Sequence, residues 1–110
     1  MNRFALGSVV NKLGLLLSTP PGQPGFVRCL QAARAGLAEG AQVYLYCLDD
    51  GVLAVSDPQL QTLRTAGLKL FACAYGAQRR GVPCDDRAVF SGLATLSDIL
   101  VGTRQFIDCQ

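Results

Sequence analysis

The sequence predicts a three-layer α/β/α sandwich built around a mostly parallel sheet of about five strands. Short apolar runs alternate along the chain with segments of helical patterning, and strands separated by helices pair in parallel through right-handed crossovers. Half of the residues are apolar and only 16% are charged, which is typical of a sheet covered on both faces. The 110 residues fit one core, so we expect a single domain over 1–110.

The first half of the chain supplies two strands and a helix. Residues 13–17 are an apolar run that ends in Ser, Thr and Pro residues, as a buried strand does where it enters a loop. Apolar residues recur at helical spacing over 25–39, and Gly40 offers a C-terminal stop. Residues 43–48 predict a second buried strand, which ends at the turn-forming sequence 49–51.

The next helix and strand lead to the middle of the chain. Ser56 or Asp57 can cap a helix that has Pro58 in its first turn. A third main strand follows over 68–74, and a short helix over 75–80 comes directly after it.

The C-terminal part predicts a very short strand over 88–90 and a weaker last strand over 104–108. Between them, Ser91 is expected to cap a helix that ends at Gly102. The spacing of three leucines predicts that they face the sheet: Leu93, Leu96 and Leu100. For residues 1–11 three interpretations stay open: an extra strand, an oligomer contact or a loose tail.

Composition argues against several classes of function. Ten basic and eight acidic side chains give a formal charge of +2, and the arginines are scattered, so we expect no nucleic-acid partner. The apolar run near the N-terminus is interrupted at Asn11 and Lys12, and no stretch reaches the ~20 apolar residues of a membrane span. We therefore expect neither an export signal nor a membrane association.

The chain has five cysteines and no histidine. No two cysteines stand two to four residues apart, which argues against a zinc site. An odd number of cysteines without an export signal favours reduced thiols and a cytoplasmic location. Cys29 and Cys47 are expected to pack in the core, and Cys109 is expected to be incidental.

The strongest candidate site lies where the strands end. Ligands of open parallel sheets bind at the carboxyl ends of the strands, where helix N-termini point their free amides. Cys73 ends the third strand at such a junction, and a helix N-terminus favours the thiolate that acts as a nucleophile. Packing as a small hydrophobe is the alternative for Cys73. Candidate lining residues along the same edge are Thr19, Asp50, Gly51, Tyr75, Arg79, Arg80, Ser91 and Gly92.

Several of these candidates also have simpler explanations. An Asp-Asp-Gly turn needs no chemistry to account for Asp50 and Gly51. Arg79 and Arg80 are more readily explained by stabilisation of the C-terminal carbonyls of the short helix. Cys84 follows a proline in an expected loop, where it is either a resolving thiol or an incidental surface thiol.

The residues 73–82 (CAYGAQRRGV), followed by Ser91, Gly92 and Leu93, resemble the sulfur-transfer segment of the DsrE/DsrF-like (DsrE/TusD-like) family. The sequence 50–52 after the second strand also fits this family, and the resemblance covers about residues 12–108. It implies a flavodoxin-like α/β sandwich without a cofactor. The loop after the first strand departs from the family pattern because it is rich in proline.

The resemblance also implies a function. Family members resemble sulfurtransferases or sulfur carriers that hold a persulfide on the cysteine matching Cys73 and pass it to a partner thiol. They usually do so within homo-oligomers (trimers or hexamers) or hetero-oligomers of related subunits. The alternative is a non-catalytic assembly or regulatory subunit with a structural cysteine. Small-ligand binding near Thr19 and Ser91 ranks last, because the sequence lacks a glycine-rich phosphate-binding motif.

Overall fold

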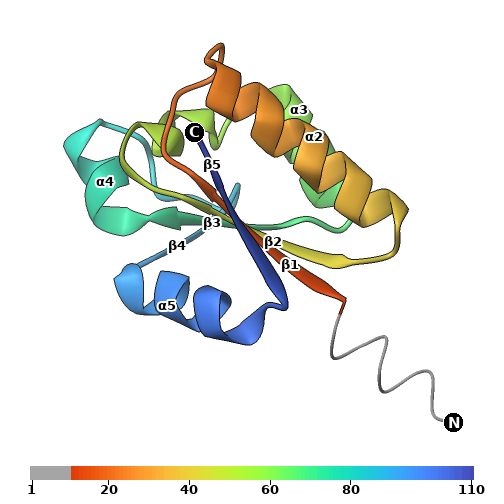
Figure 1. The fold of residues 1–110 in the computed structure, drawn as a ribbon. Helices are drawn as coiled ribbons and strands as arrows, with labels where there is room; N and C mark the ends of the chain where they lie inside the picture. Colours follow the sequence, from red (N-terminus) through yellow and green to blue (C-terminus); the bar gives the residue numbers. More distant parts are fainter. Residues whose placement is uncertain (1–10) are drawn as a thin grey trace, which may run out of the picture.

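Five parallel strands form one sheet in the computed structural model, which describes residues 11–110 (Figure 1). The strands are β1 (Lys12–Leu17), β2 (Gln42–Cys47), β3 (Lys69–Cys73), β4 (Val89–Ser91) and β5 (Gln105–Cys109). Their order across the sheet is β4-β3-β2-β1-β5, and every neighbouring pair is parallel. The predicted fold class is therefore confirmed. Apart from Asn11, the segment expected to form an extra strand or a tail lies outside the described residues.

The helices cover the sheet unequally. They are α2 (Pro24–Ala38), α3 (Pro58–Thr65), α4 (Ala74–Arg79), α5 (Leu93–Gly102) and the 3₁₀ helix η1 (Asp49–Ala54). Figure 1 shows α2 and α3 on one face of the sheet and, of the helices in residues 11–110, α5 on the other. None of the helices within residues 11–110 has the length and hydrophobicity needed to cross a membrane.

The face beneath α2 and α3 is the core of the protein. Side chains alternate between the two faces of a strand, and most of the alternate residues on this face are apolar and buried. They are Leu13, Leu15, Leu17, Val43, Leu45, Cys47, Leu70, Ala72 and Cys109. At ~25 cal/mol per Å² of apolar surface, burying each of these leucines stabilises the fold by roughly 1.5–3 kcal/mol.

The face beneath α5 is covered only in part. Tyr46 and Cys73 are buried there, Tyr44 and Phe71 are half-buried, and Val89 is exposed. The helix packs against β1 at Gly14, where a Cβ atom would lie 3.0 Å from both Ile99 and Thr103. Glycine at this position lets α5 approach the sheet closely.

The predicted helix boundaries agree with the structure to within a residue or two, and Asp57 is the N-cap of α3. Its side chain accepts a hydrogen bond from the Gln59 backbone N–H at 2.8 Å. Gly40 and Gly67 follow α2 and α3 with φ values of +83° and +118°. This left-handed conformation favours glycine, as expected for a helix stop.

Two local predictions were wrong and one was incomplete. Ser91 does not cap α5, because it is the last residue of β4 and the N-cap is Gly92. Leu93 and Leu100 are exposed rather than facing the sheet. The stripe that packs on β1 contains Leu96 and Ile99, and the other two leucines lie to one side of it at 100° per residue. The turn expected over 49–51 is the start of η1.

Candidate functional site

Cys73 lies at the carboxyl end of β3 and is the N-cap of α4. Its Sγ accepts a hydrogen bond from the backbone N–H of Gly76 at 3.3 Å. The residue is 7% exposed, so Cys73 is largely buried. Cys73 is thus held by the first turn of α4, at the edge of the sheet where the parallel strands end.

Tyr46 lies beneath the same edge and is fully buried. Its hydroxyl is within hydrogen-bonding distance of two carbonyls, those of Gly92 at 3.0 Å and Ser91 at 3.2 Å. Because the hydroxyl has one proton, the two carbonyls share it. Burial raises the pKa of Tyr46, and the neighbouring Cys73 thiol adds to this rise. Tyr46 therefore joins β2 to the start of α5 next to the thiol.

Ser91 pairs in register with Cys73 across β4 and β3. Its hydroxyl is buried, and it has no hydrogen-bond partner within the described residues. A buried hydroxyl without a partner is uncommon, since desolvation of such a group costs about 1–3 kcal/mol. The site thus combines a thiol, a tyrosine hydroxyl and an unpaired serine hydroxyl on neighbouring strands.

Arg80 and Asp50 connect α4 to η1. The Arg80 Nε lies 2.9 Å from Asp50 Oδ1, and Nη1 donates to the Gly76 carbonyl at 3.3 Å. Gly76 therefore gives its N–H to Cys73 and accepts from Arg80 with its carbonyl. Through Gly76, the ion pair fixes the turn that holds the thiol.

Gly51 allows η1 to approach the end of β1. A Cβ atom at this position would overlap the backbone carbonyl of Leu17. The Gly51 N–H donates to the Leu48 carbonyl at 2.8 Å, and the Leu48 N–H in turn donates to the Leu17 carbonyl at 2.8 Å. This close packing places Asp50 within reach of Arg80.

Tyr75 and Arg79 form a pair on the outer surface of α4. Tyr75 is 65% exposed, and Arg79 Nη1 donates to its hydroxyl at 2.9 Å. The guanidinium also lies 5.6 Å from the centre of the Tyr75 ring, within range of a cation–π interaction. These two side chains are next to the site in sequence but directed outward.

Thr19 and Cys84 lie in loops. The Thr19 hydroxyl is buried next to Gly25, where a Cβ atom would be 2.8 Å from it, and it has no hydrogen-bond partner within residues 11–110. Thr19 thus packs against the start of α2. Cys84 is exposed in the segment between α4 and β4.

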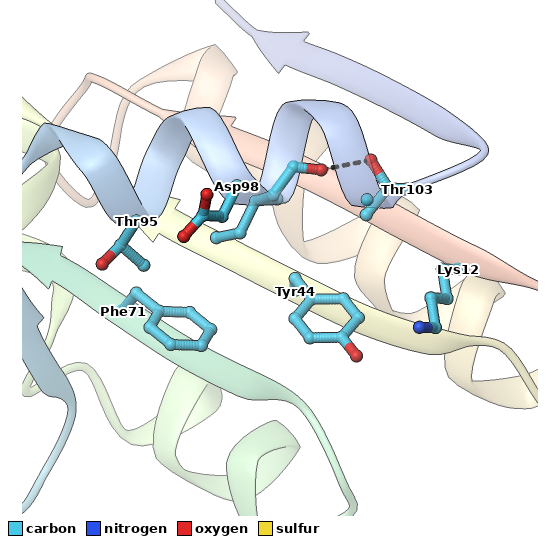
Figure 2. Close-up of a pocket in the computed structure, with 8 residues that line it drawn as sticks. Lys12, Tyr44, Phe71, Thr95, Asp98 and Thr103 are labelled. Carbon is cyan, nitrogen blue, oxygen red and sulfur yellow. Dashed lines mark hydrogen bonds between the residues drawn. The ribbon is translucent and has the colours of Figure 1, made fainter.

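A pocket of about 280 Å³ opens beside α5 and does not include Cys73 among its lining residues. Figure 2 shows Tyr44 and Phe71 side by side beneath the helix, with Thr95 and Asp98 directed toward them. The two rings are 6.4 Å apart between centres and nearly parallel. Within residues 11–110 no group of three or more acidic or cysteine side chains could hold a metal ion.

Sequence reasoning missed Tyr46 and this pocket. A tyrosine in a buried strand needs a partner for its hydroxyl, and that requirement is the signal by which Tyr46 could have been selected. The pocket has no comparable signal, because its residues come from three strands and a helix. Their proximity follows from strand order.

The fold and the site define an α/β protein with a thiol at the carboxyl edge of a parallel sheet. A family model described as DsrE/DsrF-like matches residues 11–108. The chain therefore belongs to the DsrE/DsrF-like family, which is generally related to sulfur relay. No curated protein sequence matches the chain significantly.

Two solved structures resemble the fold. The YchN protein of E. coli has a TM-score of 0.77 at 15% identity, covering 90% of this chain and 99% of that chain. A conserved protein of unknown function from Bacteroides thetaiotaomicron, BT1422, has a TM-score of 0.72 at 18% identity, covering 89% and 94% of the two chains. At these identities the likeness shows the fold alone.

Proposed function

We propose that the protein is a sulfur carrier that accepts a persulfide sulfur on Cys73 and passes it to a partner thiol. The Cys73 thiolate attacks the outer sulfur of a donor persulfide, and the S–S bond of the donor breaks. The donor leaves as a thiolate, which takes up a proton. An acceptor thiolate then attacks the outer sulfur on Cys73 and regenerates the Cys73 thiolate. Neither step needs a cofactor or a net oxidant.

The placement of Cys73 is the observation that carries this proposal. Among the five cysteines, Cys73 is the one at a strand-to-helix junction of the carboxyl edge, with the Gly76 N–H directed at its sulfur. A backbone N–H donor favours the negative charge on sulfur from which attack begins. Membership of a family related to sulfur relay supports the same role.

The surroundings of Cys73 suit a transferred sulfur. Tyr46 and Ser91 place hydroxyls on the two strands flanking β3, and the Ser91 hydroxyl has no partner in the described part of the chain. Such a hydroxyl can donate a hydrogen bond to a terminal persulfide sulfur. We assign Ser91 this positioning role within the proposal.

Intact-mass analysis after incubation with a low-molecular-weight persulfide donor tests the proposal. Cys84 is exposed and would react by itself, so Cys84→Ala is the background for the comparison. In this background we expect a mass gain of one sulfur atom, and peptide mapping should place it on residue 73. The sulfur should pass to an added thiol. The double variant Cys73→Ala, Cys84→Ala should gain at least tenfold less, and equal uptake by it would overturn the assignment.

The small exposed fraction of Cys73 favours a second candidate, a non-catalytic assembly or regulatory subunit with a structural cysteine. At 7% exposure, packing accounts for the residue without chemistry. Native alkylation with iodoacetamide distinguishes the two functions. In a carrier, iodoacetamide should modify Cys73 as fast as it modifies Cys84, or no more than about tenfold more slowly. A structural cysteine should react only on unfolding, and Cys73→Ser should then lower stability.

We further propose that the protein works with sulfur donor and acceptor proteins in the cytoplasm, as a homo-oligomer (trimer or hexamer) or with related subunits. The odd number of cysteines, five, supports a reducing compartment. Exposed apolar side chains on the α5 side, Val89, Leu93, Leu100 and Val101, support self-association.

A further inference from the structure

Three cysteines gather at the carboxyl end of the buried sheet face, away from the α5 side on which Cys73 lies. Leu17 of β1 pairs in register with Cys47 of β2 and also with Cys109 of β5. Residues paired in this way point to the same face of the sheet, and neighbouring strands are about 4.8 Å apart. Cys47 and Cys109 therefore flank Leu17 in one row beneath α2.

Cys29 approaches this row from α2. At the start of the helix, a Cβ atom on Gly25 would lie 3.0 Å from the Cys109 carbonyl oxygen and 2.8 Å from the carbonyl carbon of Gln110. Cys29 is one turn further along the same buried stripe. Because α2 connects two parallel strands, it runs antiparallel to them. Moving one helical turn (~6 Å) along α2 from Gly25 to Cys29 therefore leads back along β5, toward the Cys109 side chain. Figure 1 shows β5 ending beneath the start of α2.

The two thiols interact with each other and differ in acidity. Cys29 donates a hydrogen bond to the sulfur of its neighbour Cys109, and this bond together with burial raises the pKa of Cys29. The same hydrogen bond lowers the pKa of Cys109. Cys47 lies in the same row but is affected by burial alone, which raises its pKa to about 12. Cys109 is therefore the more acidic partner of the thiol pair, and Cys47 makes the smallest of the contributions that raise the pKa of Cys29.

We propose that Cys29 and Cys109 are a redox-active pair that forms a disulfide between α2 and β5 when the protein meets a peroxide. The Cys109 thiolate attacks one oxygen of hydrogen peroxide, which yields a sulfenic acid and water after proton uptake. The Cys29 sulfur then attacks the Cys109 sulfur, and the thiol proton of Cys29 leaves with the sulfenic hydroxyl as a second water. Two thiols and one peroxide give one disulfide and two waters, and a thiol reductant reverses the reaction.

The position of β5 explains how a buried pair can react. Cys29 and Cys109 are 0% and 2% exposed, so the oxidant needs a local opening. Within residues 11–110, β5 is an edge strand that pairs with β1, and edge elements open at lower free energy than the centre of a sheet. The disulfide would then hold β5 against α2. This proposal uses neither Cys73 nor sulfur transfer.

Mass spectrometry of the full chain tests the proposal. After treatment with hydrogen peroxide, we expect the intact mass to fall by two hydrogen atoms and a non-reducing peptide map to join residues 29 and 109. Dithiothreitol should reverse both changes. Oxidation should also raise the melting temperature and slow amide exchange in β5. A map in which 109 joins 47 or 84, or in which 29 and 109 stay reduced while Cys73 oxidises, overturns the proposal.

Single variants test which thiol reacts first. In Cys29→Ser, a sulfenic acid on Cys109 should persist and be trapped by dimedone, whereas Cys109→Ser should give at least fivefold less trapping at Cys29. Cys47→Ser is the matched control, because it removes a buried thiol of the same row and should leave the disulfide yield unchanged. Loss of the disulfide in folded Cys47→Ser, or equal trapping at the two positions, contradicts the proposed roles. The wild-type map decides the pairing even if a variant fails to fold.

Discussion

At the scale of single residues, Tyr46 shows how one hydroxyl organises the candidate site. It belongs to a central strand, is fully buried, and bonds the two carbonyls that lead into α5. The sequence predicted Cys73 at its junction because a strand followed directly by a helix can be recognised from the pattern of apolar residues. It did not predict Tyr46, because its partners are 45 and 46 residues away. A contact of that kind depends on the strand order.

We predict that Tyr46→Phe destabilises the protein by about 1–3 kcal/mol, because the carbonyls of Ser91 and Gly92 lose their buried donor. Urea unfolding at neutral pH measures the change. Tyr44→Phe is the matched control, since its hydroxyl donates to the exposed Gln42 side chain and its loss should cost less than about 0.5 kcal/mol. Equal losses for both variants would contradict the role given to Tyr46.

We also predict that the stability of the protein depends on pH through Tyr46, and Tyr46→Phe tests this dependence. The pKa of Tyr46 is raised in the folded protein, so the unfolded chain loses this proton first as the pH increases. The stabilisation from the neutral hydroxyl is complete below the ordinary tyrosine value of about 10 and is lost above it. Over roughly pH 9 to 11, the range around the ordinary pKa of tyrosine, the free energy of unfolding of the wild-type protein should fall more steeply than that of Tyr46→Phe. Parallel curves would contradict the assignment.

At the scale of elements, the sequence predicted the strands and helices well, and the errors fall where tertiary contacts decide. Apolar periodicity and cap residues located α2 and α3 to within a residue or two. The sheet-facing stripe of α5 was misplaced because nearly every turn of that helix carries a leucine or isoleucine. Which of them face inward depends on the close approach at Gly14. A local sequence pattern also could not predict the contact between η1 and α4, because Asp50 and Arg80 are 30 residues apart in the sequence.

We predict that Arg80→Met loosens α4 and makes Cys73 more reactive. The substitution removes the ion pair to Asp50 and the donor to the Gly76 carbonyl. Because the Asp50 side chain is 59% exposed, the loss in stability should stay below about 1 kcal/mol. In a Cys84→Ala background, native alkylation of Cys73 should be about threefold to tenfold faster, a range set by about 1 kcal/mol.

The matched control for that experiment is Arg79→Met. Arg79 donates a hydrogen bond to Tyr75 within the same helix, whereas Gly76 is held by Arg80. Loss of Arg79 should therefore leave the alkylation rate of Cys73 within twofold of the parent (roughly 0.4 kcal/mol at most). An equal acceleration in both variants would show that general fraying of α4, rather than the Arg80 contacts, controls access to the thiol.

At the scale of the whole molecule, the two faces of the sheet are unequal. Two helices cover the face that holds the core. Among the described residues, 11–110, the other face is covered by α5 and is open in part, including the pocket beside Tyr44 and Phe71 (Figures 1 and 2). The composition predicted a sheet covered on both faces, but it could not indicate that the described helices cover the α5 face only in part. Cys73 belongs to the incompletely covered side.

We predict that this side mediates self-association. Val89→Asp and Leu93→Asp introduce charges at residues that are 57% and 59% exposed, so they should weaken an oligomer at least tenfold without unfolding the subunit. Sedimentation equilibrium measures the association. Val27→Asp is the matched control, because Val27 is 48% exposed on α2, on the opposite face. A monomeric wild type, or an oligomer weakened only by Val27→Asp, would exclude this surface.

The order of the strands also affects how the chain acquires its fold during synthesis. β1 is made first among the described strands, yet one of its two neighbours, β5, consists of residues 105–109. Until those residues leave the ribosome, one edge of β1 stays unpaired beside the apolar side chains of Leu13 and Leu15. Unpaired apolar edges promote intermolecular pairing. The nascent protein is therefore most in need of chaperone protection in the interval before its last described strand leaves the ribosome.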